Sequence, residues 1–90
     1  MNIHVYKFIS DAGHGWLAVP RQEVETLGLE ISHYSYQDNE TGMVYLEEDC
    51  DAAVFIDAKE NLGHKIQFHE IDYPNDCFIR NLDRYEATKD

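Results

Sequence analysis

The sequence predicts a single small α+β domain, with a mostly antiparallel sheet and two helices packed on one side of it. Ninety residues are enough for only one hydrophobic core. Segments with a two-residue apolar period and segments with a helical period follow one another in the order ββαββαβ. An apolar content of 43% is too rich for a disordered chain, despite a net charge of −11. We therefore expect residues 1–90 to form one globular domain, with a frayed tail over 86–90.

A hairpin is predicted first. Residues 3–9 alternate as a strand, and we expect Ile3, Val5 and Ile9 to form its buried face. The glycines of the following turn are expected to supply positive φ angles. A second short strand then returns over residues 16–19.

A two-turn helix is predicted next. Pro20 suits the first helical position, and Val24 and Leu27 recur at helical spacing. Gly28 is placed to end this helix in the left-handed conformation.

A second hairpin is predicted around the polar turn 38–42, and its strands are expected over residues 31–37 and 43–48. Its register stays open. A four-residue loop would place Tyr34 and Tyr36 on the face of Tyr45, whereas a five-residue loop would place them on the opposite face.

The last third of the chain predicts a helix and a strand. The helix is expected over residues 50–62, with Asp49 as N-cap and Gly63 as its stop. Its core-facing residues are expected to be Ala52, Phe55, Ile56 and Leu62. A strand over 64–72 follows, with Ile66 and Phe68 facing inward, and 77–80 either adds a short strand or docks.

The charge of the chain narrows the classes of partner. Direct binding to nucleic acid or to an anionic membrane requires a basic patch, and the Lys and Arg residues are few and scattered. No apolar run approaches the ~20 residues that span a bilayer. We therefore expect a cytoplasmic protein, in which Cys50 and Cys77 are free thiols.

The strongest candidate site is the acidic junction between a strand and a helix. It holds Glu47, Glu48, Asp49 and Asp51, inside a stretch from 22 to 58 that contains no Lys or Arg. Helix capping and the helix dipole are expected to explain Asp49 and Asp51, but they leave Glu47 and Glu48 unexplained. The spacing does not match a calcium loop, and no metal or cofactor is predicted.

Aromatic residues give a second feature, because Trp16, Tyr36 and Tyr45 can form either a binding face or part of the core. His14, between two glycines, is the alternative catalytic candidate, with Glu47 and Asp49 as partners. The alternative, structural interpretation is that His14 and its flanking glycines only form a tight turn between the first two strands. No nucleophile motif accompanies it.

Two segments, Gly13-His-Gly-Trp-Leu17 with Val19-Pro20, and Tyr34-Ser-Tyr36 leading to Tyr45-Leu-Glu-Glu-Asp-Cys-Asp51, resemble a pattern found in small uncharacterised proteins of bacteriophages and prophages. The resemblance covers roughly the first sixty residues. The matching positions are His14, Trp16, Tyr36, Glu47, Asp49, Cys50 and Asp51. That family has no assigned activity, so the resemblance implies no catalytic residue.

These observations lead to three hypotheses of function. The first is a non-enzymatic phage or mobile-element protein in the host bacterial cytoplasm that occludes a basic surface of a host protein, as an anti-CRISPR or anti-restriction inhibitor would. Its expected binding residues are Glu47, Glu48, Asp49, Asp51, Trp16, Tyr36 and Tyr45. The second is a small metal-dependent or His14-based enzyme. The third is a structural or small-ligand-binding domain.

Overall fold

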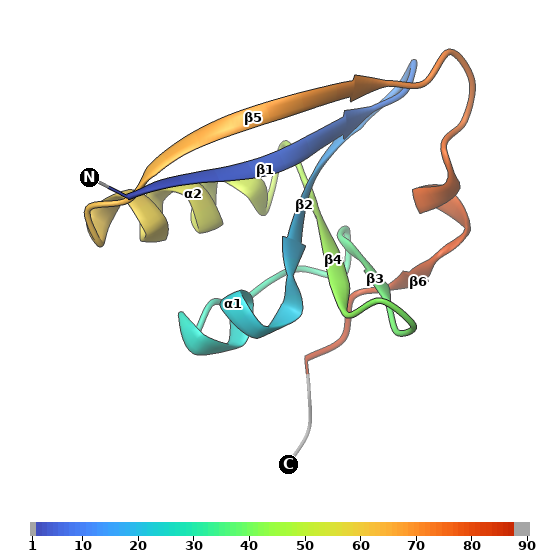
Figure 1. Cartoon of the computed structure of the whole chain (residues 1–90). Helices are drawn as coiled ribbons and strands as arrows, with labels where there is room; N and C mark the ends of the chain where they lie inside the picture. The colour runs from blue at the N-terminus through green and yellow to red at the C-terminus, as the bar shows by residue number, and fades with distance from the viewer. Residues whose placement is uncertain (1, 88–90) are drawn as a thin grey trace.

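A six-stranded sheet in the order β5-β1-β2-β4-β3-β6 organises the computed structural model, which describes residues 2–87 (Figure 1). The elements are β1 (Ile3–Ser10), β2 (Gly15–Pro20), α1 (Arg21–Thr26), β3 (Tyr36–Asp38), β4 (Met43–Glu47), α2 (Ala52–Asn61), β5 (Lys65–Asp72), the 3₁₀ helix η1 (Phe78–Asn81) and β6 (Asp83–Arg84). The β1–β5 pair is parallel and the other pairs are antiparallel. The predicted α+β class is confirmed.

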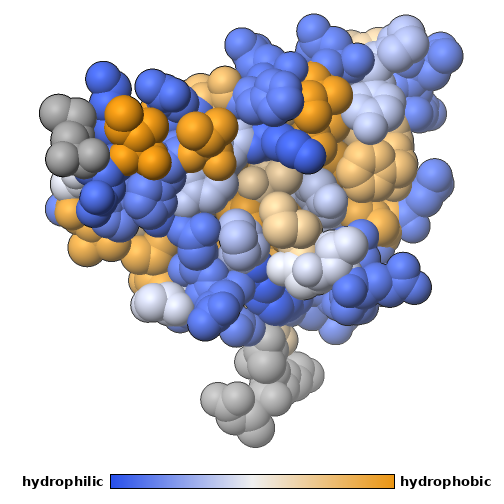
Figure 2. Space-filling view, in the orientation of Figure 1, coloured by the Kyte–Doolittle hydropathy of each residue, from blue (hydrophilic) through white to orange (hydrophobic). Residues whose placement is uncertain are grey.

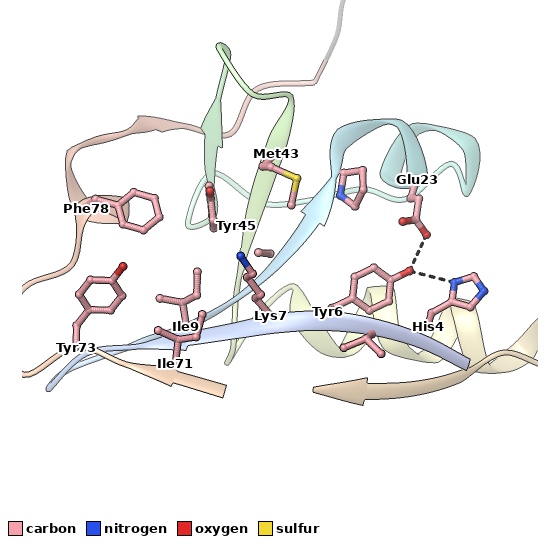
Figure 3. A pocket seen from close by; sticks show the side chains of 13 residues that line it. His4, Tyr6, Lys7, Ile9, Glu23, Met43, Tyr45, Ile71, Tyr73 and Phe78 are labelled. Carbon is pink, nitrogen blue, oxygen red and sulfur yellow. Dashed lines mark hydrogen bonds between the residues drawn. The ribbon is translucent and has the colours of Figure 1, made fainter. Parts of the chain in front are cut away.

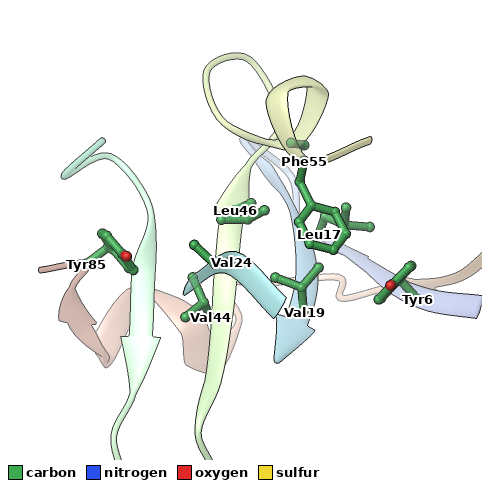
Figure 4. Close-up of a cluster of buried hydrophobic side chains, with 9 residues drawn as sticks. Tyr6, Leu17, Val19, Val24, Val44, Leu46, Phe55 and Tyr85 are labelled. Carbon is green, nitrogen blue, oxygen red and sulfur yellow. The ribbon is translucent and has the colours of Figure 1, made fainter. Parts of the chain in front are cut away.

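Both helices pack on one face of the sheet. Val24 of α1 and Phe55 of α2 belong to the same buried cluster as Leu17 and Leu46 of the central strands (Figure 4). Burying a side chain of this size contributes about 1.5–3 kcal/mol. This cluster forms the larger of two cores.

A smaller core lies on the opposite face. Trp16 and Tyr45 of the central strands are buried there under Cys77 and Ile79. The segment from 77 to 80 therefore docks on the sheet, which is one of the two outcomes that its sequence left open. Since this segment covers only part of the face, the sheet stays open beyond it.

The predicted buried face of β1 is wrong for two of its three residues, because only Ile9 is buried, in the smaller core. Ile3 is 52% exposed and Val5 is 61% exposed, whereas Tyr6 is only 7% exposed and packs with the helices. The two-residue period correctly separated the faces, but it cannot say which face the helices cover.

The turn between β1 and β2 also differs from its prediction, because its glycines do not have positive φ angles. The Asp11 carboxylate shapes the turn instead, accepting hydrogen bonds from the backbone N–H groups of Gly13 and His14 at 3.0 and 3.1 Å. Gly15 is required for a different reason. A Cβ there would lie 2.7 Å from the Phe8 ring, which is closer than real contacts allow.

The second hairpin has the four-residue loop, so Tyr36 pairs directly with Tyr45. Its first strand is shorter than predicted, because residues 31–35 form no strand. The Asp51 carboxylate holds that segment by accepting hydrogen bonds from Ser32 and Ser35. Hydrogen bonds to the Asp51 side chain thus hold this segment, in place of the strand pairing that the two-residue period predicted.

The stops predicted at Gly28 and Gly63 are confirmed, with φ angles of 65° and 87°. The prediction that Asp49 caps α2 is wrong, since Asp51 is the N-cap residue, and the Asp51 side chain accepts no capping hydrogen bond from the helix. Leu62 is also exposed instead of facing the core, because α2 ends at Asn61.

The strand predicted over 64–72 is confirmed as β5, and Ile66 packs against the core as predicted. Phe68 points to the same face, toward α2, but it stays 48% exposed on this sheet edge. The part of the predicted tail that the structure describes is held in place. Tyr85 is buried, and the Glu86 carbonyl accepts a hydrogen bond from Arg21 at 3.0 Å. Residues 88–90 lie outside the described chain.

Candidate functional site

A pocket of about 360 Å³ opens where β2, β3 and β4 meet the C-terminal segment. It is lined by His14, Trp16, Tyr34, Tyr36, Glu47, Asp49, Cys50, Arg80 and Arg84. Strand pairing explains the gathering, because Glu47 lies opposite Trp16 and Tyr36 lies opposite Arg84. Most positions that carry the phage-like pattern therefore meet in one pocket.

Rings and guanidinium groups form one wall of this pocket. The Trp16 and Tyr36 rings meet edge to face, with centroids 6.2 Å apart. Arg80 lies over Trp16 at 5.6 Å, and Arg84 lies over Tyr36 at 4.4 Å. Cation–π contacts of this kind fix the planes of the rings.

Arg80 is held by Asp11, whose side chain is fully buried. The guanidinium donates Nε–H and Nη2–H to the two carboxylate oxygens at 2.6 and 2.7 Å. This pairing holds the pKa of Asp11 well below its usual range and raises the pKa of Arg80. The charge of Arg80 is therefore compensated within the protein.

Glu47 contributes a carboxylate that is largely removed from water. It is 8% exposed, and its Oε2 accepts a hydrogen bond from the backbone N–H of Asp49 at 3.0 Å. Within residues 2–87 it forms no ion pair. A carboxylate in such a setting attracts a cation more strongly than one in bulk water.

Cys50 sits beside this carboxylate. Its hydrogen bond with Glu47, partial burial and the charges of neighbouring acids all raise the pKa of the thiol. The thiolate is the nucleophilic form, so the pocket keeps Cys50 in its unreactive state near neutral pH. Cys50 is exposed, Cys77 is buried, and both are free thiols.

His14 lies at the same pocket, with its ring 5.9 Å from that of Trp16. The structure thus brings the alternative catalytic candidate together with Glu47 and Asp49. Across residues 2–87, no three His, Cys, Asp or Glu side chains are arranged to hold a metal ion.

The other predicted site residues have different positions. Asp51 is 4% exposed, so its carboxylate is committed to the fold and is not part of a surface. Glu48 is exposed but lines a separate hollow beside Phe8, and Tyr45 is buried in the smaller core. The pocket therefore unites Trp16, Tyr36, Glu47 and Asp49, but not the whole predicted set.

In the folded protein, basic side chains from outside residues 22–58 contact this stretch, which itself contains no Lys or Arg. Lys59 Nζ donates to Glu23 at 2.7 Å, and Arg21 lies 3.6 Å from Glu25. Arg80 and Arg84 reach the acidic junction from the C-terminal segment. Nothing local in the sequence signals the role of these two arginines, because they lie over thirty residues beyond the strands that they contact.

One donor of the pocket wall has no acceptor. Trp16 Nε1 is buried, and the described chain offers it no hydrogen-bond partner. Unpaired buried donors are rare, so we expect an ordered water or an atom from outside the chain to complete this one.

No helix within the described chain is long and apolar enough to span a membrane. Comparisons with protein-family models, with curated proteins and with solved structures found no match to this chain.

Proposed function

We propose that the protein is a non-enzymatic binding protein, which engages a basic surface of a partner protein through the pocket at the end of β4. One observation supports this most: Glu47, which has no ion pair among residues 2–87, places a mostly buried carboxylate beside the Trp16 and Tyr36 rings. A Lys or Arg side chain entering the pocket would gain Glu47 as a charge partner.

The local balance of charge favours a basic partner. Asp11 compensates the charge of Arg80, and the Asp76 carboxylate also lies 3.6 Å from the Arg80 guanidinium. The remaining pocket charges are Glu47 and Asp49 against Arg84. With a net charge of −11, the whole molecule would also accelerate encounter with a basic surface at low salt.

The phage-like pattern makes a host protein the proposed partner. In this proposal the carboxylates occupy a Lys- and Arg-lined groove that otherwise binds nucleic-acid phosphates. An anti-CRISPR or anti-restriction inhibitor acts in this way by occlusion, without chemistry of its own.

Affinity capture from bacterial lysate at low and high salt tests the proposal. The pocket variant is Glu47→Gln with Asp49→Asn, and Asp51 is left intact because it is buried. Its matched control is Asp57→Asn with Glu60→Gln, which removes the same charge from exposed positions on α2.

We expect the wild type and the control to capture one basic partner that high salt releases, and the pocket variant to lose it. Equal capture by both variants would show that general acidity, and not the pocket, is responsible. Capture that does not change with salt would contradict a charged interface.

A small His14-based enzyme is the second candidate, because His14 shares the pocket with Glu47 and Asp49. The raised pKa of the Cys50 thiol argues against Cys50 as the nucleophile of such an enzyme. If partner capture survives His14→Ala unchanged, the binding function does not depend on this imidazole.

A further inference from the structure

Beyond the pocket of the proposed function, the sheet has an unpaired internal edge where β1 and β2 separate. The two strands pair only from Lys7 with Ala18 to Ser10 with Gly15. β1 continues to Ile3 in contact with β5 alone, while β2 turns away toward α1 (Figure 1). We call the resulting V-shaped opening the fork.

Backbone groups of β1 point into the fork without a strand partner. The carbonyls of Asn2 and Ser10 both accept hydrogen bonds from the β5 side. Since the polar groups of a strand alternate in direction, those of Ile3 and Val5 point the other way, where β2 is absent. Their side chains are also largely exposed.

The fork opens onto a hollow of about 650 Å³ (Figure 3). Its walls are mainly apolar and include Val5, Ile9, Ala18, Met43 and Ile71. An edge with free donors and acceptors next to an apolar hollow is the combination that binds an extended peptide by strand addition.

The exposed charges that β1 and β5 place on the Val5 face are basic, and Glu23, the one acid among the described residues that line the hollow, is paired with Lys59. Strand register places Lys7, Lys65 and His69 on the face of Val5, whereas Glu70 and Asp72 point to the other face. Lys7 reaches from β1 into the hollow between the strands (Figure 3). Figure 2 shows apolar and hydrophilic side chains side by side on this surface.

We infer that the fork binds an extended segment of another protein that carries both apolar and acidic side chains on the same face of its strand. The segment adds as a strand to Ile3 and Val5, its apolar side chains enter the hollow, and its carboxylates, on that same face, meet Lys7 and Lys65. This second surface would take a partner of the opposite charge to that of the proposed site.

The test uses the full chain, with two short capped peptides as probes. Thr occupies every second position of both peptides, and the positions between hold Val and Glu in one peptide and Val and Lys in the other, so that these side chains share one face of the strand. Amide signals are followed by NMR during each titration. We expect the Glu peptide to shift the Ile3 and Val5 amides most, and to bind at least about tenfold more tightly than the Lys peptide.

Two variants sharpen the result. Val5→Pro removes a fork-facing N–H and leaves the β1–β5 hydrogen bonds in place, and we expect about fivefold to tenfold weaker binding. Lys7→Gln should weaken binding of the Glu peptide, and it should not weaken binding of the Lys peptide, which serves as the matched control. If Val5→Pro fails to fold, Lys7→Gln and the mapped shifts still decide the matter.

Three results would overturn the inference. The first is no shift with millimolar Glu peptide. The second is equal affinity for both peptides. The third is that the largest shifts fall on Ile66 and Phe68, whose amides face the outer edge of β5.

Discussion

Removing the Asp51 carboxylate is expected to destabilise the fold severely, although this residue is one of several acids in an acidic run. Asp51 accepts hydrogen bonds from Ser32 N at 3.1 Å, from Ser32 Oγ at 2.7 Å and from Ser35 Oγ. Ser35 Oγ in turn accepts from the backbone N–H of Glu47 at 2.9 Å. The network joins the segment before β3 to the end of β4.

The magnitude follows from the donors left behind. In Asp51→Ala, one buried and two partly buried donors lose a charged acceptor, and each such bond is worth roughly 1.5–3 kcal/mol. Because the effects are not additive, we expect a loss of about 3–5 kcal/mol in the free energy of unfolding. For a domain of this size the melting temperature should fall by at least about 12 °C.

Urea unfolding followed by circular dichroism measures this loss. Asp49→Ala is the matched control two residues away, and its exposed side chain should change stability by less than about 0.5 kcal/mol. If Asp51→Ala cost no more than Asp49→Ala, the assignment of Asp51 to the fold instead of to a binding surface would be refuted.

Three further predictions follow from the titratable groups. Glu23→Gln should cost about 2–4 kcal/mol in urea unfolding, because it leaves the nearly buried Lys59 without its carboxylate, and Lys59→Met should recover part of that loss. Glu47→Gln should speed alkylation of Cys50 at pH 8, since the Glu47 hydrogen bond is the main cause of its raised thiol pKa; an unchanged rate would contradict that cause. The pKa of Asp11 is lowered in the folded protein, so ionised Asp11 stabilises the fold at pH values above its unfolded pKa of about 4. This stabilisation is lost as the pH falls. Asp11→Asn should therefore make the free energy of unfolding depend less on pH in the acidic range.

Local signals in the sequence predicted local structure well. Gly28 and Gly63 end their helices because a left-handed residue after a helix favours glycine, which needs no knowledge of the rest of the fold. The failures concern choices made by distant residues. The face of β1 that is buried depends on where α1 and α2 pack, and the strand period does not contain that information.

The candidate site shows the same division. Tyr36 meets Tyr45 through the hairpin that the sequence predicted, whereas Trp16 lies opposite Glu47 through the β2–β4 pairing, which no local signal indicated. Asp51 could not be assigned, because a carboxylate before a helix suits a cap as well as a buried acceptor for serines. Arg80 and Arg84 arrive through the docking of the C-terminal segment, which depends on tertiary packing alone.

The central claim is that the pocket accepts a basic side chain, and Trp16 is the reporter that tests it most directly. It is the only tryptophan of the chain, so its indole N–H gives a single NMR signal. The protein is titrated with a capped arginine peptide, with its glutamate counterpart, and again with the arginine peptide after Glu47→Gln. We predict a saturable shift of the indole signal with arginine alone, lost in Glu47→Gln. An equal response to both peptides, or a response to arginine that survives Glu47→Gln, would contradict the account.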